Sequence, residues 1–400
     1  MYTAEIPYGV YWSTPFAKWQ GSLQHLNAIE FAAHVAKQEL ARRNFPLEEI
    51  DHAILGTTVP QHHSFYGTPW MTGMMGLMNV TGPTIAQACA TGARTVQAAA
   101  QEILTGDART VLVVTADRCS NGPHLYYPAP KGPGGTGAHE DWVLDNFSCD
   151  PLGLHAMLDT AENVAKKHGI STDAQHDLVL RRAEQYRDAL KDDQAFQKRY
   201  MTLPFPVPAP NFKKDVAALD GDEGIFPTSA ESMAKLQPVK KGGTVTFAAQ
   251  THPADGNAGL IITTPERAQA LSKDAKIAVR IRGFGQARTT LAHMPEATIP
   301  AARRALAQAG KSIADMAAIK SHNPFAVNDI VFAKETGADL RTMNNYGSSL
   351  IWGHPQGPTG LRSLIELIEE LALRGGGFGL FQGCAAGDSA MAVVIEVTGR

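Results

Sequence analysis

Three residues with reactive side chains stand where an apolar segment gives way to a loop or a helix. Cys89 follows the apolar run 83–86 and precedes a helical apolar pattern over 96–104. The free N–H groups and the positive dipole end of such a helix favour the thiolate, which is the nucleophilic form of cysteine. His354 in Gly-His-Pro-Gln-Gly and Cys384 in Gly-Cys-Ala-Ala-Gly-Asp lie in similar settings. A lone cysteine is usually a small buried residue, but three such junctions together indicate a reactive site.

The composition is that of an ordinary globular protein. With 400 residues, 44% of them hydrophobic and 19% charged, the chain suggests two or three packed units. No apolar run approaches the roughly 18 residues needed to cross a bilayer, and the first residues lack the features of a signal peptide. We therefore expect a cytoplasmic protein. The formal net charge of -3 argues against a general affinity for nucleic acid or for anionic membranes.

The cysteines and histidines lack the spacing of metal ligands. The four cysteines are scattered and form no Cys-x-x-Cys pair: Cys89, Cys119, Cys149 and Cys384. His62 and His63 are adjacent in sequence, so their side chains diverge, and they have no suitably spaced carboxylate. We therefore expect reduced thiols and no metal site.

Helical and strand-like segments alternate along most of the chain, which indicates an α/β core. In the first part we expect a helix at 23–44, the helix after Cys89, and strands at 50–55, 110–115, 243–247 and 258–263. An excursion at 118–243 carries helices at 157–168 and 172–190. The last part has predicted strands at 277–284, 316–320, 377–382 and 389–397 and helices at 300–309 and 359–374. Two halves built on one plan favour a shared site between them, beyond the strand ends.

The motifs, taken in order, make the chain resemble a thiolase over nearly its full length. The matching pieces are Gln-Ala-Cys-Ala-Thr-Gly at 87–92, Thr-Ala-Glu-Asn-Val-Ala at 160–165, Gly-Thr-Val-Thr at 243–246, Asp255-Gly256, Gly-His-Pro at 353–355 and Gly383-Cys384. The resemblance implies an α/β fold with a duplicated αβαβα layered core and an inserted loop domain. It divides the chain into an N-terminal core half at 1–117 plus 244–267, a loop domain on the CoA side at 118–243, and a C-terminal core half at 268–400.

The resemblance also implies a Claisen-type exchange through an acyl-cysteine, with coenzyme A as substrate and no cofactor. Cys89 is then the nucleophile, His354 the base that activates it, and Cys384 the acid and base for the departing enolate. The chemistry is consistent, since breaking a carbon–carbon bond beside a thioester requires a proton at the leaving carbon. His322, in His-Asn-Pro-Phe, stands where sterol-carrier-type thiolases have a histidine, and it is expected to donate to the enolate oxygen. The backbone near Cys89 and Ala386 is expected to hold the thioester oxygen.

Four residues are expected to bind substrate: Met157, Thr251, Trp352 and Ala386. The aromatic residues near the motifs suggest a bulky, branched or aromatic acyl group, although such rings equally suit core or dimer contacts: Phe65, Tyr66, Trp70, Tyr126, Tyr127 and Trp352. In this respect the chain resembles the thiolase subunit of benzoylsuccinyl-CoA thiolase. That resemblance implies a small zinc-containing OB-fold partner protein, and the absence of a zinc motif here leaves such a module to a partner.

Three other functions stay open. A biosynthetic acetoacetyl-CoA thiolase would use the same residues. A ketoacyl-synthase-like condensing enzyme decarboxylates its donor and needs no second thiol, so Cys384 argues against it. An inactive scaffold that kept the fold would not require the full set of Cys89, His322, His354 and Cys384.

We predict that the purified protein is a homo-oligomer, because the resemblance implies a homodimer or a dimer of dimers joined through the apolar segment 84–88. Sedimentation should give a multiple of the 42.9 kDa chain mass. A single species of 42.9 kDa would refute this, and core burial alone would then explain the apolar segment.

Overall fold

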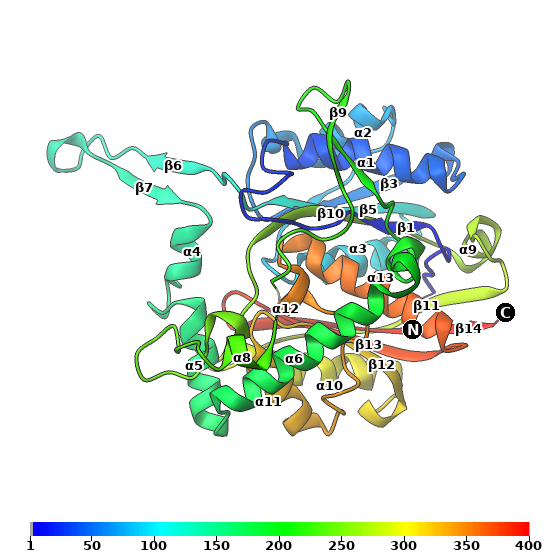
Figure 1. Ribbon diagram of the computed structural model, residues 1–400. Coiled ribbons are helices and arrows are strands. Elements are labelled where there is room, and N and C mark those ends of the chain that lie inside the picture. The colour runs from blue at the N-terminus through cyan, green and yellow to red at the C-terminus, as the bar shows by residue number, and fades with distance from the viewer. Residues whose placement is uncertain (1–2, 227, 400) are drawn as a thin grey trace.

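The computed structural model describes residues 3–226 and 228–399, which form five alternating layers of helix and sheet (Figure 1). Helices α1 (Ala28–Arg42) and α2 (Gly67–Met75) cover the outer face of the first sheet. Helices α10 (Thr298–Ala309) and α11 (Ala326–Thr336) lie on the outer face of the second sheet. Between the sheets lie α3 (Thr91–Thr105) and α13 (Gly357–Leu373). This confirms the layered αβαβα core expected from the sequence.

The two sheets repeat one arrangement of strands. The first has the order β1-β10-β5-β3-β4, with β2 also paired to β10, and the second has the order β11-β14-β13-β12. In each, a parallel pair lies beside an antiparallel strand: β3 and β5 beside β10, and β12 and β13 beside β14. The strands of the first sheet are β1 (Tyr11–Ser13), β2 (Ala17–Lys18), β3 (His52–Gly56), β4 (Thr84–Ile85), β5 (Thr110–Arg118) and β10 (Ala254–Thr263). Those of the second are β11 (Ile277–Arg288), β12 (Met316–His322), β13 (Gly377–Ala385) and β14 (Ser389–Gly399).

The central strands are buried on both faces, which explains their continuous apolar sequences. In β5, Val111 and Val113 face the central helices, whereas Leu112 and Val114 face the outer layer with α1. The strands are therefore held firmly on both faces, so reactive groups at their ends have well-defined positions.

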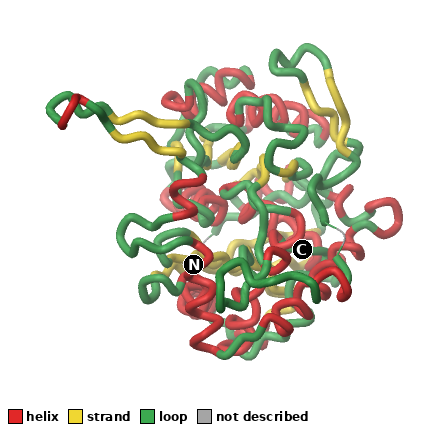
Figure 2. The backbone as a smooth tube through the Cα atoms, turned by 60° about the vertical axis from the view of Figure 1, so that its left-hand side comes forward, coloured by secondary structure: helices red, strands yellow, loops and turns green. Residues whose placement is uncertain are grey.

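The segment that joins the halves forms a projecting arm and a group of helices over the second sheet. Strands β6 (His124–Tyr127) and β7 (Ala138–Asp141) pair as a hairpin that extends away from the body in both views (Figures 1 and 2). Helices α5 (Met157–His168) and α6 (Thr172–Ala189) pack on α11 and share its hydrophobic cluster. The shorter elements are α4 (Leu144–Ser148), α7 (Lys191–Gln194), β8 (Phe205–Pro208), β9 (Asp215–Leu219), α8 (Ala230–Met233), α9 (Pro265–Leu271) and α12 (Ser349–Trp352). No helix in the described part of the chain has both the length and the apolar character needed to cross a membrane.

Two elements differ from the sequence-based expectation. The first helix begins at Ala28 instead of 23, because the Asn27 side chain accepts the N–H groups of the first turn and caps it. The expected strand at 243–247 is absent. The carboxylate of Glu162 accepts the N–H groups of Thr244 and Val245, so this backbone is not available for a sheet ladder. The other core helices and strands lie within a few residues of their predicted bounds.

The two central helices meet at their N-terminal ends with no room for a side chain. A Cβ atom on Gly92 of α3 would lie 2.6 Å from the Leu361 backbone nitrogen and 2.7 Å from the Gly357 carbonyl oxygen of α13. Four residues of the predicted α3 stripe, Val96, Ala99, Ala100 and Ile103, are buried, whereas the fifth, Leu104, is 49% exposed. The contact sets the segments before the two helices side by side, and these segments carry Cys89 and His354.

We predict that Gly92→Ala lowers the free energy of unfolding by about 1–3 kcal/mol, because the added methyl group forces the two helices apart. The matched control is Gly73→Ala in α2, where a Cβ atom meets nothing within 4 Å. That substitution should be neutral or slightly stabilising. Urea denaturation followed by circular dichroism provides the comparison, and equal stability of the two variants would contradict a close helix contact.

Candidate active site

Cys89 lies in a tight turn between β4 and α3. Ala88 has a positive φ of 43°, which turns the chain sharply before the cysteine. The hydroxyl of Thr91 accepts the N–H of Gln87 at 2.8 Å and donates to the Ala88 carbonyl at 2.7 Å, so it closes the turn. The first helical residue is Thr91, which places the thiol just before the helix N-terminus, as the sequence predicts.

The imidazole of His354 is aligned with the Cys89 thiol. The Cys89 Sγ and His354 Nε2 atoms are 3.1 Å apart, and His354 Nδ1 lies 2.7 Å from Thr359 Oγ1. When Nδ1 donates its proton to Thr359, Nε2 is free to accept the proton of the thiol. Thr359 stands in the first turn of α13, so a helix fixes the orientation of the base. Sequence reasoning did not single out Thr359.

Burial keeps both members of this pair neutral. It raises the pKa of the Cys89 thiol to about 12, although the backbone N–H groups of Ala386 and of Cys89 itself oppose the rise. Burial also lowers the pKa of His354 to about 3, with His252 adding to the decrease. The stabilised thiolate inferred from the helix terminus is therefore wrong for the resting site, because desolvation outweighs the helix and the backbone donors. The thiol proton must transfer to His354 as the sulfur attacks.

His322 packs against His354 with one ring nitrogen free. The ring centroids are 4.0 Å apart at 24°, and His322 Nδ1 lies 2.9 Å from Ser349 Oγ. The Nε2 atom of His322 has no hydrogen-bond partner among the described residues, although it is buried. Burial lowers the pKa of His322 well below its ordinary value, so the ring is neutral. When Ser349 donates to Nδ1, Nε2 carries a proton and can donate to an oxygen in the site.

Cys384 completes the set at the end of β13. The register pairs His322 of β12 with Gly383, so both groups lie at the same edge of the second sheet. Cys384 is fully buried, and its Sγ atom accepts a hydrogen bond from Asn328 Nδ2 at 3.2 Å. Burial raises the pKa of the Cys384 thiol well above its ordinary value. The Sγ atom of Cys89 and one ring nitrogen each of His322 and His354 lie within 4.8 Å of one another. Three separate segments of the chain bring them together.

Cys89 and His354 line a cavity of about 470 Å³, whereas His322 and Cys384 lie behind them and are not part of its wall. Three of the expected substrate-binding residues line it, namely Met157, Thr251 and Ala386, as do Cys89 and His354. The remaining wall is largely apolar and includes Leu144, Phe147, Leu158, Phe247, Met294 and Phe325. An apolar cavity with a few polar groups at one end is typical of a site for a small organic ligand.

The fourth expected substrate-binding residue, Trp352, does not reach the cavity. Its ring is fully buried against Phe16 and the Arg362 guanidinium, so it is a packing residue. The other aromatic residues suggested for the acyl site also lie elsewhere. Phe65 is 95% exposed and Tyr66 65% exposed, and Tyr126 and Tyr127 belong to the projecting arm.

Asp117, which the sequence analysis did not single out as a site residue, joins the two halves of the site. Its carboxylate accepts the N–H groups of Thr58, Val59 and Gly357 at 2.7–3.0 Å, besides two threonine hydroxyls. Gly357 begins α13, three residues after His354. Burial raises the pKa of Asp117 to about 6 in spite of the backbone donors. The available signal was a single carboxylate near the end of a largely apolar strand.

Two family models together match most of the chain. The model "Thiolase, N-terminal domain" matches residues 12–266, and "Thiolase, C-terminal domain" matches residues 275–397. An acetyl-CoA acetyltransferase of Allochromatium vinosum is 30% identical over 384 residues, covering 94% of this chain and 95% of that protein. The solved Bacillus anthracis acetyl-CoA acetyltransferase has a TM-score of 0.89 at 25% identity, covering 99% of both chains. Human mitochondrial 3-ketoacyl-CoA thiolase has a TM-score of 0.88 at 26% identity, again covering 99% of both.

We predict that activity falls as the pH drops through about 6, because protonation of Asp117 weakens its acceptance of the Gly357 N–H. Asp117→Asn should lose about tenfold in kcat/KM at neutral pH, since an amide cannot accept all of these hydrogen bonds. In this variant, the loss of activity on the acidic side of the pH profile should disappear or move to another pH. The control is Asp51→Asn, because Asp51 also accepts backbone N–H groups but lies at the far end of β5. An unchanged rate and an unchanged acidic limb in Asp117→Asn would contradict the role of this carboxylate.

Proposed function

The chain belongs to the thiolase family of CoA-dependent acyltransferases, and on that premise we propose that it cleaves a 3-ketoacyl-CoA with coenzyme A through an acyl-Cys89 intermediate. The observation that carries this proposal is the convergence of Cys89, His322 and His354, of which Cys89 and His354 line an apolar cavity. Cys384 lies near enough to Cys89 for a charge on one thiol to affect the other. It supplies the second acid–base group that carbon–carbon cleavage needs, besides His354.

In the first half-reaction, the Cys89 sulfur attacks the ketone carbon C3, and the thiol proton passes to His354 Nε2. The C2–C3 bond then breaks, its electron pair remains on C2 as an enolate, and the Cys384 thiol supplies the proton that makes the shorter CoA thioester. The N–H groups of Cys89 and Ala386 stabilise the oxyanion on C3. His322 donates to the enolate oxygen.

In the second half-reaction, coenzyme A takes the acyl group from Cys89. The sulfur of coenzyme A attacks the thioester carbon, and the Cys89 sulfur leaves. The proton held by His354 first passes to the Cys384 thiolate, and His354 then takes the proton of coenzyme A and delivers it to the departing Cys89 sulfur. The site is then restored with all protons accounted for.

For the acyl group we propose an apolar substituent bulkier than that of acetoacetyl-CoA, with branched, aromatic or benzoylsuccinyl groups as candidates. The support is the wall of the cavity beside Cys89, which includes Leu144, Phe147 and Met294. The exposed and buried rings discussed above lend no support. Acetoacetyl-CoA is the second candidate, since several relatives are named acetyl-CoA acetyltransferases.

We also propose that the enzyme works as a homo-oligomer, with a small zinc-containing OB-fold protein as a further partner. The support for self-association is an exposed apolar group beside the edge strand β4 that precedes the nucleophile. Phe65, Tyr66 and Met78 are each at least 65% exposed. A group of large apolar side chains exposed in this way is typical of a surface that binds another protein.

We predict that the protein cleaves at least one 3-ketoacyl-CoA only when coenzyme A is added, and that bulky apolar acyl groups are cleaved faster than acetoacetyl-CoA. The measurement is a panel of linear, branched and aromatic 3-ketoacyl-CoA thioesters, with mass spectrometry of both products and of Cys89. Cys89→Ser is the control, because an alcohol is a far weaker nucleophile at neutral pH. Preference for acetoacetyl-CoA would select the second candidate, and no cleavage of any member would refute the proposed function.

A further inference from the structure

We propose that Asn328 is a positioning residue for Cys384, and that its side-chain amide holds the sulfur and favours the thiolate form needed at the carbon acid. This inference rests on the proposed function, because it assigns a role in only one of its two chemical steps. Asn328 stands in the first turn of α11 and has no reactive group of its own.

The amide of Asn328 is fixed in one orientation by its two hydrogen bonds. Its oxygen accepts the backbone N–H of Phe325 at 3.2 Å, which caps the helix. Its nitrogen is therefore the atom directed at the Cys384 sulfur, at 3.2 Å. Both residues are fully buried, so water does not compete for either group. An N–H donor at this place stabilises a negatively charged sulfur more than a neutral one.

The surroundings of Cys384 make this donor important. The sulfur is packed in the hydrophobic cluster beneath the second sheet, and burial disfavours its thiolate. Negative charge on Cys89 or Asp329 would disfavour it further. Asn328 opposes these effects, together with the backbone N–H of Cys384 itself. Removal of the amide would leave the thiolate without its side-chain donor.

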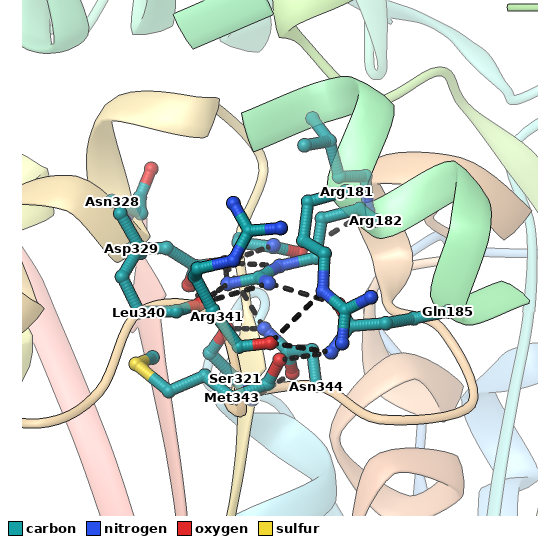
Figure 3. Close-up of polar contacts among 12 residues, drawn as sticks. Arg181, Arg182, Gln185, Ser321, Asn328, Asp329, Leu340, Arg341, Met343 and Asn344 are labelled. Atoms are coloured by element: carbon teal, nitrogen blue, oxygen red, sulfur yellow. Dashed lines mark hydrogen bonds and ion pairs between the residues drawn. The ribbon is translucent and has the colours of Figure 1, made fainter. Parts of the chain in front are cut away.

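The next residue in the helix supports the second reactive group of the same sheet edge. Asp329 accepts hydrogen bonds from Ser321 at 2.5 Å and from Asn323 at 2.6 Å, and these residues flank His322. Figure 3 shows Arg182 of α6 directed at the same carboxylate, with an N–O distance of 3.0 Å. Two consecutive residues thus hold Cys384 and the His322 segment, and the ion pair with Arg182 anchors both.

The alternative is that Asn328 matters only as a helix cap, and the side-chain chemistry separates the two roles. Asn328→Asp keeps an oxygen for the Phe325 N–H but has no N–H for the sulfur. Asn328→Ala removes both hydrogen bonds. A pure capping role predicts that the aspartate variant behaves like the wild type, whereas the proposed role predicts that both variants fail at the carbon acid.

The experiment measures the two chemistries separately. Acylation of Cys89 by acetyl-CoA is followed by mass spectrometry of the protein. Proton removal from carbon is followed as deuterium uptake into the methyl group of acetyl-CoA in D2O. We expect Asn328→Ala and Asn328→Asp to acylate Cys89 within about twofold of wild type, while deuterium uptake and CoA-dependent cleavage fall about tenfold to a hundredfold, the worth of a hydrogen bond to a charged group.

Two further variants calibrate the result. Cys384→Ala should show the same division with a larger loss. Asn27→Ala removes the cap of α1, far from the site, and should leave both reactions unchanged.

The inference is overturned if Asn328→Asp keeps wild-type deuterium uptake. It is also overturned if both reactions fall equally while circular dichroism shows a native fold. A wild-type protein that neither acylates Cys89 nor exchanges deuterium would instead refute the proposed function, so the two failures are distinguishable.

Discussion

The contact between the two central helices fixes the distance on which the site depends. Gly92 of α3 lies against the backbone of α13, at a separation that excludes even a methyl group. Cys89 and His354 lie in the segments just before these two helices. The 3.1 Å distance between Cys89 Sγ and His354 Nε2 therefore follows from backbone packing. Asp117 adds a second connection, because it ties the first turn of α13 to the end of β5. Reactive groups held by rigid elements keep a productive geometry better than groups on mobile loops.

The reactive side chains are buried or half-buried, and this determines how charge must be handled in the site. Both imidazoles and both thiols are neutral at rest, because burial disfavours every charged form. Charge appears only when substrate supplies the electrophile, and by then the donors are already in place. The hydroxyls of Ser349 and Thr359 hold the two imidazoles, and the amide of Asn328 holds one sulfur. Such fixed dipoles need no reorganisation during the reaction, which is the main source of their catalytic benefit.

Local signals predicted the order of most core helices and strands, and the resemblance to thiolases predicted the layers. Short motifs pointed to Cys89, His322, His354 and Cys384, and the structure brings the first three within 4.8 Å of one another. Apolar periodicity identifies buried strands and helices, and short motifs identify the loops at their ends. The supporting residues were not predicted. Asp329 and Arg182 are 147 positions apart and form a pair only because α6 packs on α11. Trp352 was misplaced for a related reason, since its nearness to His354 in sequence says nothing about the direction of its ring.

The errors in secondary structure have an equally physical cause. The segment 243–247 has the β-branched composition of a strand, but Glu162, distant in sequence, accepts its N–H groups. A side chain from another element thus replaced the expected sheet partner. Local propensity gives no information about such competition, because both outcomes satisfy the backbone.

The charged residues of α13 have partners in several other parts of the chain. Glu369 of α13 accepts a hydrogen bond from Tyr11 of the N-terminal strand and pairs with Arg199 of the inserted segment. Arg362 of α13 pairs with Asp222, also of the inserted segment. Glu366 of α13 pairs with Lys320 of the second sheet. A fragment that lacks the inserted segment would bury the Glu369 carboxylate without its cation Arg199, at a cost of several kcal/mol. We therefore expect that the repeated halves do not fold as independent proteins. The topology is that of a duplication, but the buried charges of α13 tie the second sheet and the inserted segment to the same helix.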